Sequence, residues 1–119
     1  RLGRGRRAVV TASLQSVVRR TREGPGTAVA GTPYLELTAL AERMKAEDGR
    51  IIFDSLRPMG DEFWNMIDGE RSVEVIAEAV CLEFGFDLSP GLFLPLVEGM
   101  VASGVAEIVS SENEGVHAR

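Results

Sequence analysis

The chain has 119 residues, of which 45% are hydrophobic and 26% are charged. This length and composition are typical of one ordinary globular domain, and no apolar run approaches the ~20 residues that a membrane-spanning helix needs. The single cysteine, Cys81, excludes an internal disulfide, and together with the single histidine, His117, it is too little for a zinc site. The formal net charge of −5 is spread unevenly along the chain.

Positive charge gathers at the start of the sequence. Residues 1–30 carry seven arginines and one acid, a net charge of +6, whereas residues 31–119 carry −11. A basic segment on an acidic body indicates nucleic acid as one candidate partner, because phosphate contacts supply most non-specific affinity. The same composition fits a loosely ordered arm or a transit peptide, with weak helical spacing over residues 8–18. We place a domain boundary near residue 30 and a polar tail at residues 110–119.

Two strands are predicted at the start of the acidic body. Residues 34–39 alternate with the period of two that a half-buried strand shows. Asp48 and Gly49 then precede a β-branched run, which is a strong hairpin signal. Residues 50–56 form the clearest strand pattern in the chain, and Pro58 and Gly60 end it.

Three helices and a closing strand are predicted for residues 61–109. Asp61 is the candidate cap of a first helix that closes at Gly69. Ser72 caps the second helix, and Gly85 ends it. The third helix spans residues 90–103, with Pro90 at its first position.

The end of the chain completes a recognisable order of elements. Pro95 lies in the second turn of the third helix, where its missing backbone donor predicts a kink. Residues 105–109 alternate again and predict a short strand. The predicted fold class is α+β: a small antiparallel sheet of two or three strands, three helices and a closing strand. This order describes a winged-helix-like domain.

Several short motifs follow one another in a fixed order through the helical part and the closing strand. They are Trp64, Ile67, Asp68-Gly69, Arg71-Ser72-Val73-Glu74, Ile76-Ala77 and Gly104-Val105-Ala106-Glu107-Ile108. In this order, residues 35–109 resemble the PqqD-like family. Two features depart from the family pattern: only residues 56–58 separate the predicted strand from the first helix, and Pro95 stands in the third helix.

The resemblance implies a RiPP recognition element, a non-catalytic peptide chaperone of natural-product biosynthesis. Such a module binds the leader segment of a ribosomally synthesised precursor peptide and presents it to a modifying enzyme such as a radical SAM maturase. The leader adds as a strand to the sheet edge and packs beside the third helix. Carried onto this sequence, the peptide-binding residues are Arg50, Ile51, Ile52, Phe53, Asp54, Ser55, Leu92, Phe93, Leu96 and Met100. We expect a cytoplasmic protein without a cofactor, and edge pairing allows a homodimer.

Ordinary structural roles compete with these assignments. The apolar residues of the predicted strand and of the third helix are more typical of a core than of a binding groove, and Trp64 is expected to be a core anchor. The neighbouring acids at positions 61–62 and 68–70 are explained by a cap and a solvated turn. Cys81 lies at mid-helix without a nearby histidine and is expected to be a small buried hydrophobe. We therefore expect no catalytic residues, no metal site and no enzymatic activity.

Two other functions stay open at this point. One is a winged-helix protein that binds nucleic acid through its basic N-terminal arm. We do not expect it to read a duplex, because the second and third predicted helices contain no lysine or arginine. The other is a structural domain that docks onto a partner enzyme.

Overall fold

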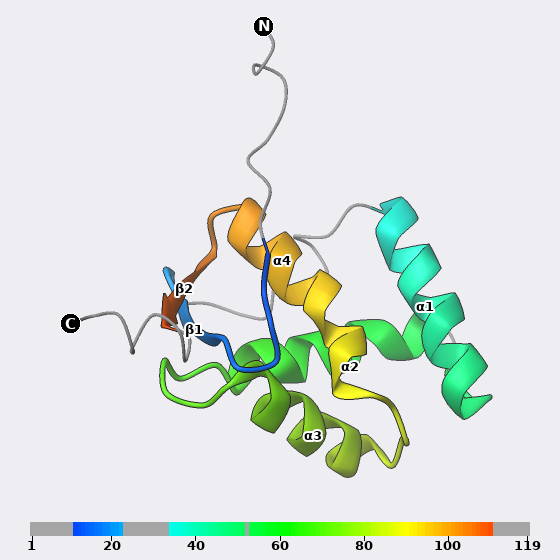
Figure 1. Ribbon diagram of the computed structural model, residues 1–119. Coiled ribbons are helices and arrows are strands. Elements are labelled where there is room, and N and C mark those ends of the chain that lie inside the picture. Colours follow the sequence, from blue (N-terminus) through cyan, green and yellow to red (C-terminus); the bar gives the residue numbers. More distant parts are fainter. Residues whose placement is uncertain (1–10, 23–33, 52, 111–119) are drawn as a thin grey trace, which may run out of the picture.

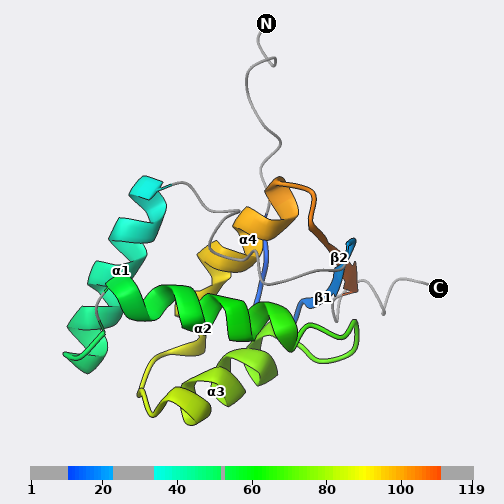
Figure 2. The same ribbon diagram turned by 180° about the vertical axis from the view of Figure 1, so that it is seen from behind.

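The computed structural model describes residues 11–22, 34–51 and 53–110 (Figure 1). Within these ranges the protein is a small α+β domain with four α-helices and a two-stranded antiparallel sheet. Figures 1 and 2 show the sheet at one end of the molecule and α1 at the other. In chain order the elements are β1 (Val17–Arg20), α1 (Tyr34–Asp48), α2 (Phe53–Asn65), α3 (Val73–Phe84), a 3₁₀ helix (Pro90–Phe93), α4 (Leu94–Ala102) and β2 (Ala106–Ser110).

The first predicted strand, at residues 34–39, is wrong, because this segment begins α1. The inner face of α1 buries Leu37, Leu40 and Met44, which follow the spacing of a helix and not of a strand. Gly49 ends the helix with φ +86°, and its N–H donates to the carbonyl of Lys45 at 2.6 Å. The Asp-Gly pair is therefore a helix terminus and not a hairpin.

The second predicted strand, at residues 50–56, is also wrong. Its last four residues begin α2, a helix that continues to Asn65 and includes Pro58. Leu56, Met59 and Phe63 are fully buried at helical spacing, so burial of this row outweighs the β propensity of residues 51–53. Asp61 lies inside the helix and does not cap it.

Of the later predicted elements, the second helix and the closing strand are confirmed, whereas the first helix ends at Asn65 and not at Gly69, and the third is divided in two. The hydroxyl of Ser72 accepts a hydrogen bond from the Val75 N–H at 3.3 Å and so caps α3, and Gly85 ends α3 with φ +75°. The irregularity expected at the start of the third helix takes the form of a separate 3₁₀ helix. Pro95 then falls in the first turn of α4, where no intrahelical donor is needed. The closing strand is β2, one residue later than predicted.

The hydrophobic core lies between α2, α3 and α4 and extends to α1. Trp64 is fully buried, as predicted, and the stacked rings of Phe63 and Phe93 have centroids 5.6 Å apart. Cys81 is also buried, as predicted, and burial raises the pKa of its thiol. Among the helices of the described ranges, none has both the length and the apolarity needed to cross a bilayer.

The N-terminal arm is not wholly separate from the domain. Residues 17–20 form β1, which pairs with β2 in the register Val18↔Ile108 and Arg19↔Glu107, with an irregularity after Val17. Val18 is 1% exposed, and the guanidinium of Arg20 lies over the Trp64 ring, 5.6 Å from its centroid. Residues 17–20 thus belong to the domain, although the predicted boundary near residue 30 leaves them outside it. Residues 17 and 18 are part of a strand, so the helical spacing predicted over residues 8–18 is wrong at its end. Residues 1–10 and 23–30 of the predicted arm, and nearly all of the predicted tail, lie outside the described residues.

Because β1 belongs to the core, we expect Val18→Ala to lower the free energy of unfolding by about 2 kcal/mol. Val109→Ala is the matched control, since Val109 lies in β2 with 39% of its surface exposed. We expect this control to stay within about 0.5 kcal/mol of the unmodified protein. Urea unfolding measures both values, and equal stabilities of the two variants would contradict the placement of β1.

Candidate functional site

The residues predicted to form a peptide-binding strand edge do not form one. Arg50 and Ile51 lie in the connection between α1 and α2, and residues 53–55 are the first turn of α2. Ile51 is fully buried, whereas Asp54 is exposed and Ser55 is half-buried. Ile52 and the side chain of Phe53 lie outside the described part of the chain. The predicted edge is wrong because its described residues lie in a connection and in the first turn of a helix. Neither has the row of unpaired N–H and C=O groups that a strand edge offers.

Arg50 instead joins the end of α1 to the segment after α3. Its guanidinium donates to the Asp48 carboxylate at 2.7 and 3.1 Å and to the Gly85 carbonyl at 2.7 Å. It also lies over the Phe86 ring, 5.1 Å from the centroid. The hydrogen bond from Arg50, followed by one from the backbone of Asp87, lowers the pKa of Asp48. These contacts assign Arg50 a structural role.

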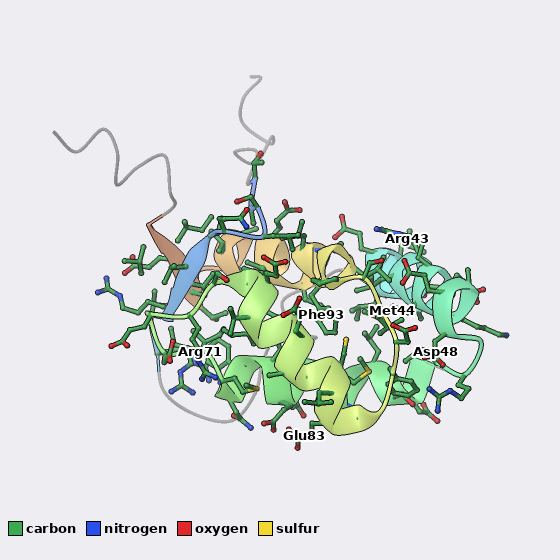
Figure 3. All side chains as sticks on the ribbon, turned by 60° about the horizontal axis from the view of Figure 1, so that its bottom comes forward. Arg43, Met44, Asp48, Arg71, Glu83 and Phe93 are labelled. Atoms are coloured by element: carbon green, nitrogen blue, oxygen red, sulfur yellow. The ribbon has the colours of Figure 1, made fainter. Side chains whose placement is uncertain are left out.

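The residues predicted to line a groove are core residues. Phe93, Leu96 and Met100 are fully buried, and Leu92 is 7% exposed. Figure 3 shows Phe93 deep in the molecule, behind α3. The predicted groove wall is therefore wrong, and the competing interpretation of these residues as core is confirmed.

The motif at residues 68–72 builds the turn between α2 and α3. One carboxylate oxygen of Asp68 accepts the N–H groups of Glu70 and Arg71 at 2.9 and 3.0 Å. The other accepts the Arg71 side chain at 2.9 Å, and Arg71 also donates to the Met66 carbonyl at 2.8 Å. Gly69 supplies the positive φ of +78° that the turn requires. The motif that carries the family resemblance thus has a structural role in this chain.

The segment before β1 completes the N-terminus of α3. The carbonyl of Ser16 accepts the N–H of Val73 at 2.9 Å, and that of Leu14 accepts the N–H of Glu74 at 3.0 Å. A helix leaves these first-turn N–H groups unpaired by itself. The two carbonyls and the Ser72 hydroxyl together occupy the N–H groups of the first turn of α3, so this turn has no donor left for an anionic ligand.

β1 is paired on both sides, whereas β2 is paired on one. The Thr21 N–H donates to the Val105 carbonyl at 2.9 Å, so these two residues are a hydrogen-bonded pair of the antiparallel ladder, and the Val18 carbonyl accepts the Gly69 N–H at 3.1 Å on the side away from β2. Hydrogen-bonded and non-hydrogen-bonded pairs alternate along such a ladder, so Val18 and Ile108 form a non-hydrogen-bonded pair. The peptide groups of Ile108 therefore point away from β1. Within the described ranges no element pairs with that side of β2. We call residues 106–110 the open edge.

The two faces of the sheet differ in chemistry. Ala106 and Ile108 pack against the core, whereas Glu107 is half-exposed and Val109 exposed on the outer face. Arg19 and Glu107 form an ion pair across the outer face. A strand added to the open edge would alternate between the rim of the core and the neighbourhood of Val109.

The part of the chain that the structure describes contains no cluster of three or more histidine, cysteine, aspartate or glutamate side chains suited to a metal ion. No family model, no curated protein and no solved structure matches the chain. The resemblance of residues 35–109 to the PqqD-like family therefore stays a prediction.

β1 is the element that sequence reasoning missed, and with it the position of the open edge. Its signal in the sequence is the pair Val17-Val18 followed by Arg19, two β-branched residues and then an exposed charge. Four residues of this kind are too short a pattern to separate a strand from a helix. Only the distant partners of β1 make it a strand.

The turn at residues 68–72 predicts a defined dependence of stability on pH. Hydrogen bonds from the backbone of Arg71 and Glu70 lower the pKa of Asp68 from 3.8 to about 2. Since the folded-state pKa lies below the unfolded value, the ionised carboxylate stabilises the fold above pH 4. This contribution is lost as the pH falls from about 4 to about 2.

We therefore expect Asp68→Asn to lower the free energy of unfolding by about 1 kcal/mol at neutral pH, a small value because water screens a side chain that is 41% exposed. The difference from the unmodified protein should shrink below pH 4. Glu70→Gln removes a charge from the same turn and is the control. Urea unfolding at several pH values tests this expectation, and a difference that does not change between pH 7 and pH 2 would contradict it.

Proposed function

We propose that the protein is a non-catalytic binding module that receives an extended peptide along the open edge of β2. The observation that carries this proposal is the side of residues 106–110 that no described residue pairs with, next to a β1 that is paired on both sides. An exposed strand edge is a template for another strand, and main-chain hydrogen bonds then supply affinity. The proposal moves the peptide from residues 50–55 to the open edge.

The family resemblance suggests which peptide this is. The order of α2, α3, α4 and β2 agrees with the winged-helix-like arrangement that the resemblance implies. In that family the ligand is the leader segment of a ribosomally synthesised precursor, presented to a modifying enzyme such as a radical SAM maturase. We carry this ligand, this partner and a cytoplasmic location over as parts of the proposal.

The surroundings of the open edge favour a peptide with apolar side chains at alternate positions. Ile108 is half-buried at the rim of the core, and Val109 is exposed on the outer face. Each gives a docked side chain an apolar neighbour, while the carboxylate of Glu107 is already paired with Arg19. The edge has five residues, and a flexible peptide loses conformational freedom when it binds there, so we expect a Kd of about 1 μM.

Duplex nucleic acid has less support as a ligand. α3 and α4 contain no lysine or arginine, so neither has the side chains that meet phosphates. On the adjoining turn and sheet, Arg71 is paired with Asp68 and Arg19 with Glu107. The contacts that position a helix on DNA are therefore missing from these elements.

The open edge predicts a contrast between neighbouring amides. In the free protein we expect the Ile108 amide to exchange with solvent faster than the Glu107 amide, because Glu107 faces β1. Addition of candidate leader peptides should slow exchange at Ile108 and move resonances of residues 106–110. Nuclear magnetic resonance of ¹⁵N-labelled protein measures both effects. Equal protection of the two amides in the free protein, or resonance shifts confined to other elements, would contradict the proposal.

Backbone methylation of the peptide provides the matched control. N-methylation at the residues whose N–H groups face β2 should weaken binding at least tenfold, because it removes the donors of the ladder. N-methylation at the intervening residues should leave most of the affinity. Two peptides of equal affinity would show that binding does not occur by strand addition.

A further inference from the structure

The outer face of α3 carries an apolar row that no described element covers. Leu82 is 84% exposed and Val75 is 47% exposed, with the half-buried Ala79 between them. Spacings of four and three residues place the three side chains on one side of the helix, as in the seam of a coiled coil. Figure 3 shows α3 at the front of the molecule, with no other helix over it. We call these three residues the α3 row.

The fold does not need the α3 row. The opposite side of α3 already supplies the core with Val73, Ile76, Ala77, Val80 and Cys81. A helix that is apolar on both sides is normally covered on both sides. A single exposed leucine such as Leu35, which is 80% exposed on α1, is ordinary, but an aligned row marks an interaction surface.

Glutamates border the α3 row on both sides. In the numbering of a coiled-coil heptad, Val75 and Leu82 occupy d positions and Ala79 an a position, so Glu78 and Glu83 fall at the flanking g and e positions. α3 has no lysine or arginine. Among the described residues, neither Glu78 nor Glu83 has an ion-pair or hydrogen-bond partner. The face therefore combines an apolar seam with uncompensated negative charge.

We infer that the α3 row docks an amphipathic helix of another protein, whose apolar seam is flanked by lysine or arginine. Charge complementarity selects this occupant, because e and g charges set partner choice in paired helices. A second copy of α3 would place glutamates against glutamates, which disfavours self-pairing. One face of a 12-residue helix is a small interface, so we expect a transient complex. This surface is separate from the open edge, and the inference does not depend on peptide binding there.

The test uses two synthetic 21-residue helices with leucine at the a and d positions. One has lysine and the other glutamate at the e and g positions, and binding to the full chain is followed by fluorescence anisotropy. We expect the lysine peptide to bind at least tenfold more tightly than the glutamate peptide. Its affinity should fall as salt rises, because salt screens exposed charges. Equal affinity of the two peptides, or no binding of the lysine peptide, would overturn the inference.

Two kinds of variant then locate the contact. Leu82→Ser should weaken binding of the lysine peptide at least tenfold, whereas Leu35→Ser, a leucine of similar exposure on α1, should not change it. Joint replacement Glu78→Lys and Glu83→Lys should reverse the preference in favour of the glutamate peptide. Both leucines are exposed, so thermal unfolding should be equal in the two serine variants. Equal binding by these two variants would remove the α3 row from the contact.

One outcome would assign the surface to the chain itself. The segment 1–10 carries four arginines and is a possible competitor for an acidic face. If the lysine peptide binds only after residues 1–10 are deleted, the α3 row serves an internal contact, and the inference of a separate partner is overturned. Binding of equal strength with and without these residues supports the separate partner.

Discussion

A peptide group that leaves water needs a hydrogen-bond partner, and residues 12–21 find theirs in three distant parts of the chain. β2 pairs with one side of β1, the turn at Gly69 binds the other side, and the first turn of α3 binds the carbonyls of Leu14 and Ser16 just before β1. The Ala12 N–H donates to the Glu98 carboxylate on α4 at 3.0 Å. These bonds join the N-terminal segment to elements 50 to 90 positions away. The position of every other feature of the sheet follows from them.

The first consequence concerns which backbone is left for a ligand. Because both sides of β1 are occupied, only the far side of β2 can accept another strand within the described chain. The second consequence concerns the motif at residues 68–72. Asp68 and Arg71 shape the turn that delivers the Gly69 N–H to the Val18 carbonyl, so their side chains support the sheet. Side chains of a turn can thus fix the position of a sheet edge that they do not touch.

Local signals predicted the part of the fold in which local and tertiary preferences agree. α3 was predicted because its cap, its apolar face and its terminal Gly85 all indicate one helix. The segments before it were misread because alternation over six residues fits a strand, whereas Leu37, Leu40 and Met44 reveal a helix only over a longer window. β1 escaped prediction because no nearby residue pairs with it. The predicted peptide-binding edge was wrong because residues 50–55 do not form a strand. The residues predicted to line the groove, on the third helix, are core residues, as the sequence also indicated.

The same pairing also separates the two proposed surfaces. Segment 14–16 seals the N-terminus of α3, and β1 continues from it to pair with β2, so one strand stands between the helix and the open edge. A peptide on β2 would extend the sheet on its far side, while a helix on the α3 row would lie along the outer face of α3 (Figure 1). Neither ligand needs the backbone groups that the other uses. Since hydrogen bonds connect α3, β1 and β2, a partner bound at α3 and a peptide bound at β2 would be held in a fixed arrangement relative to each other.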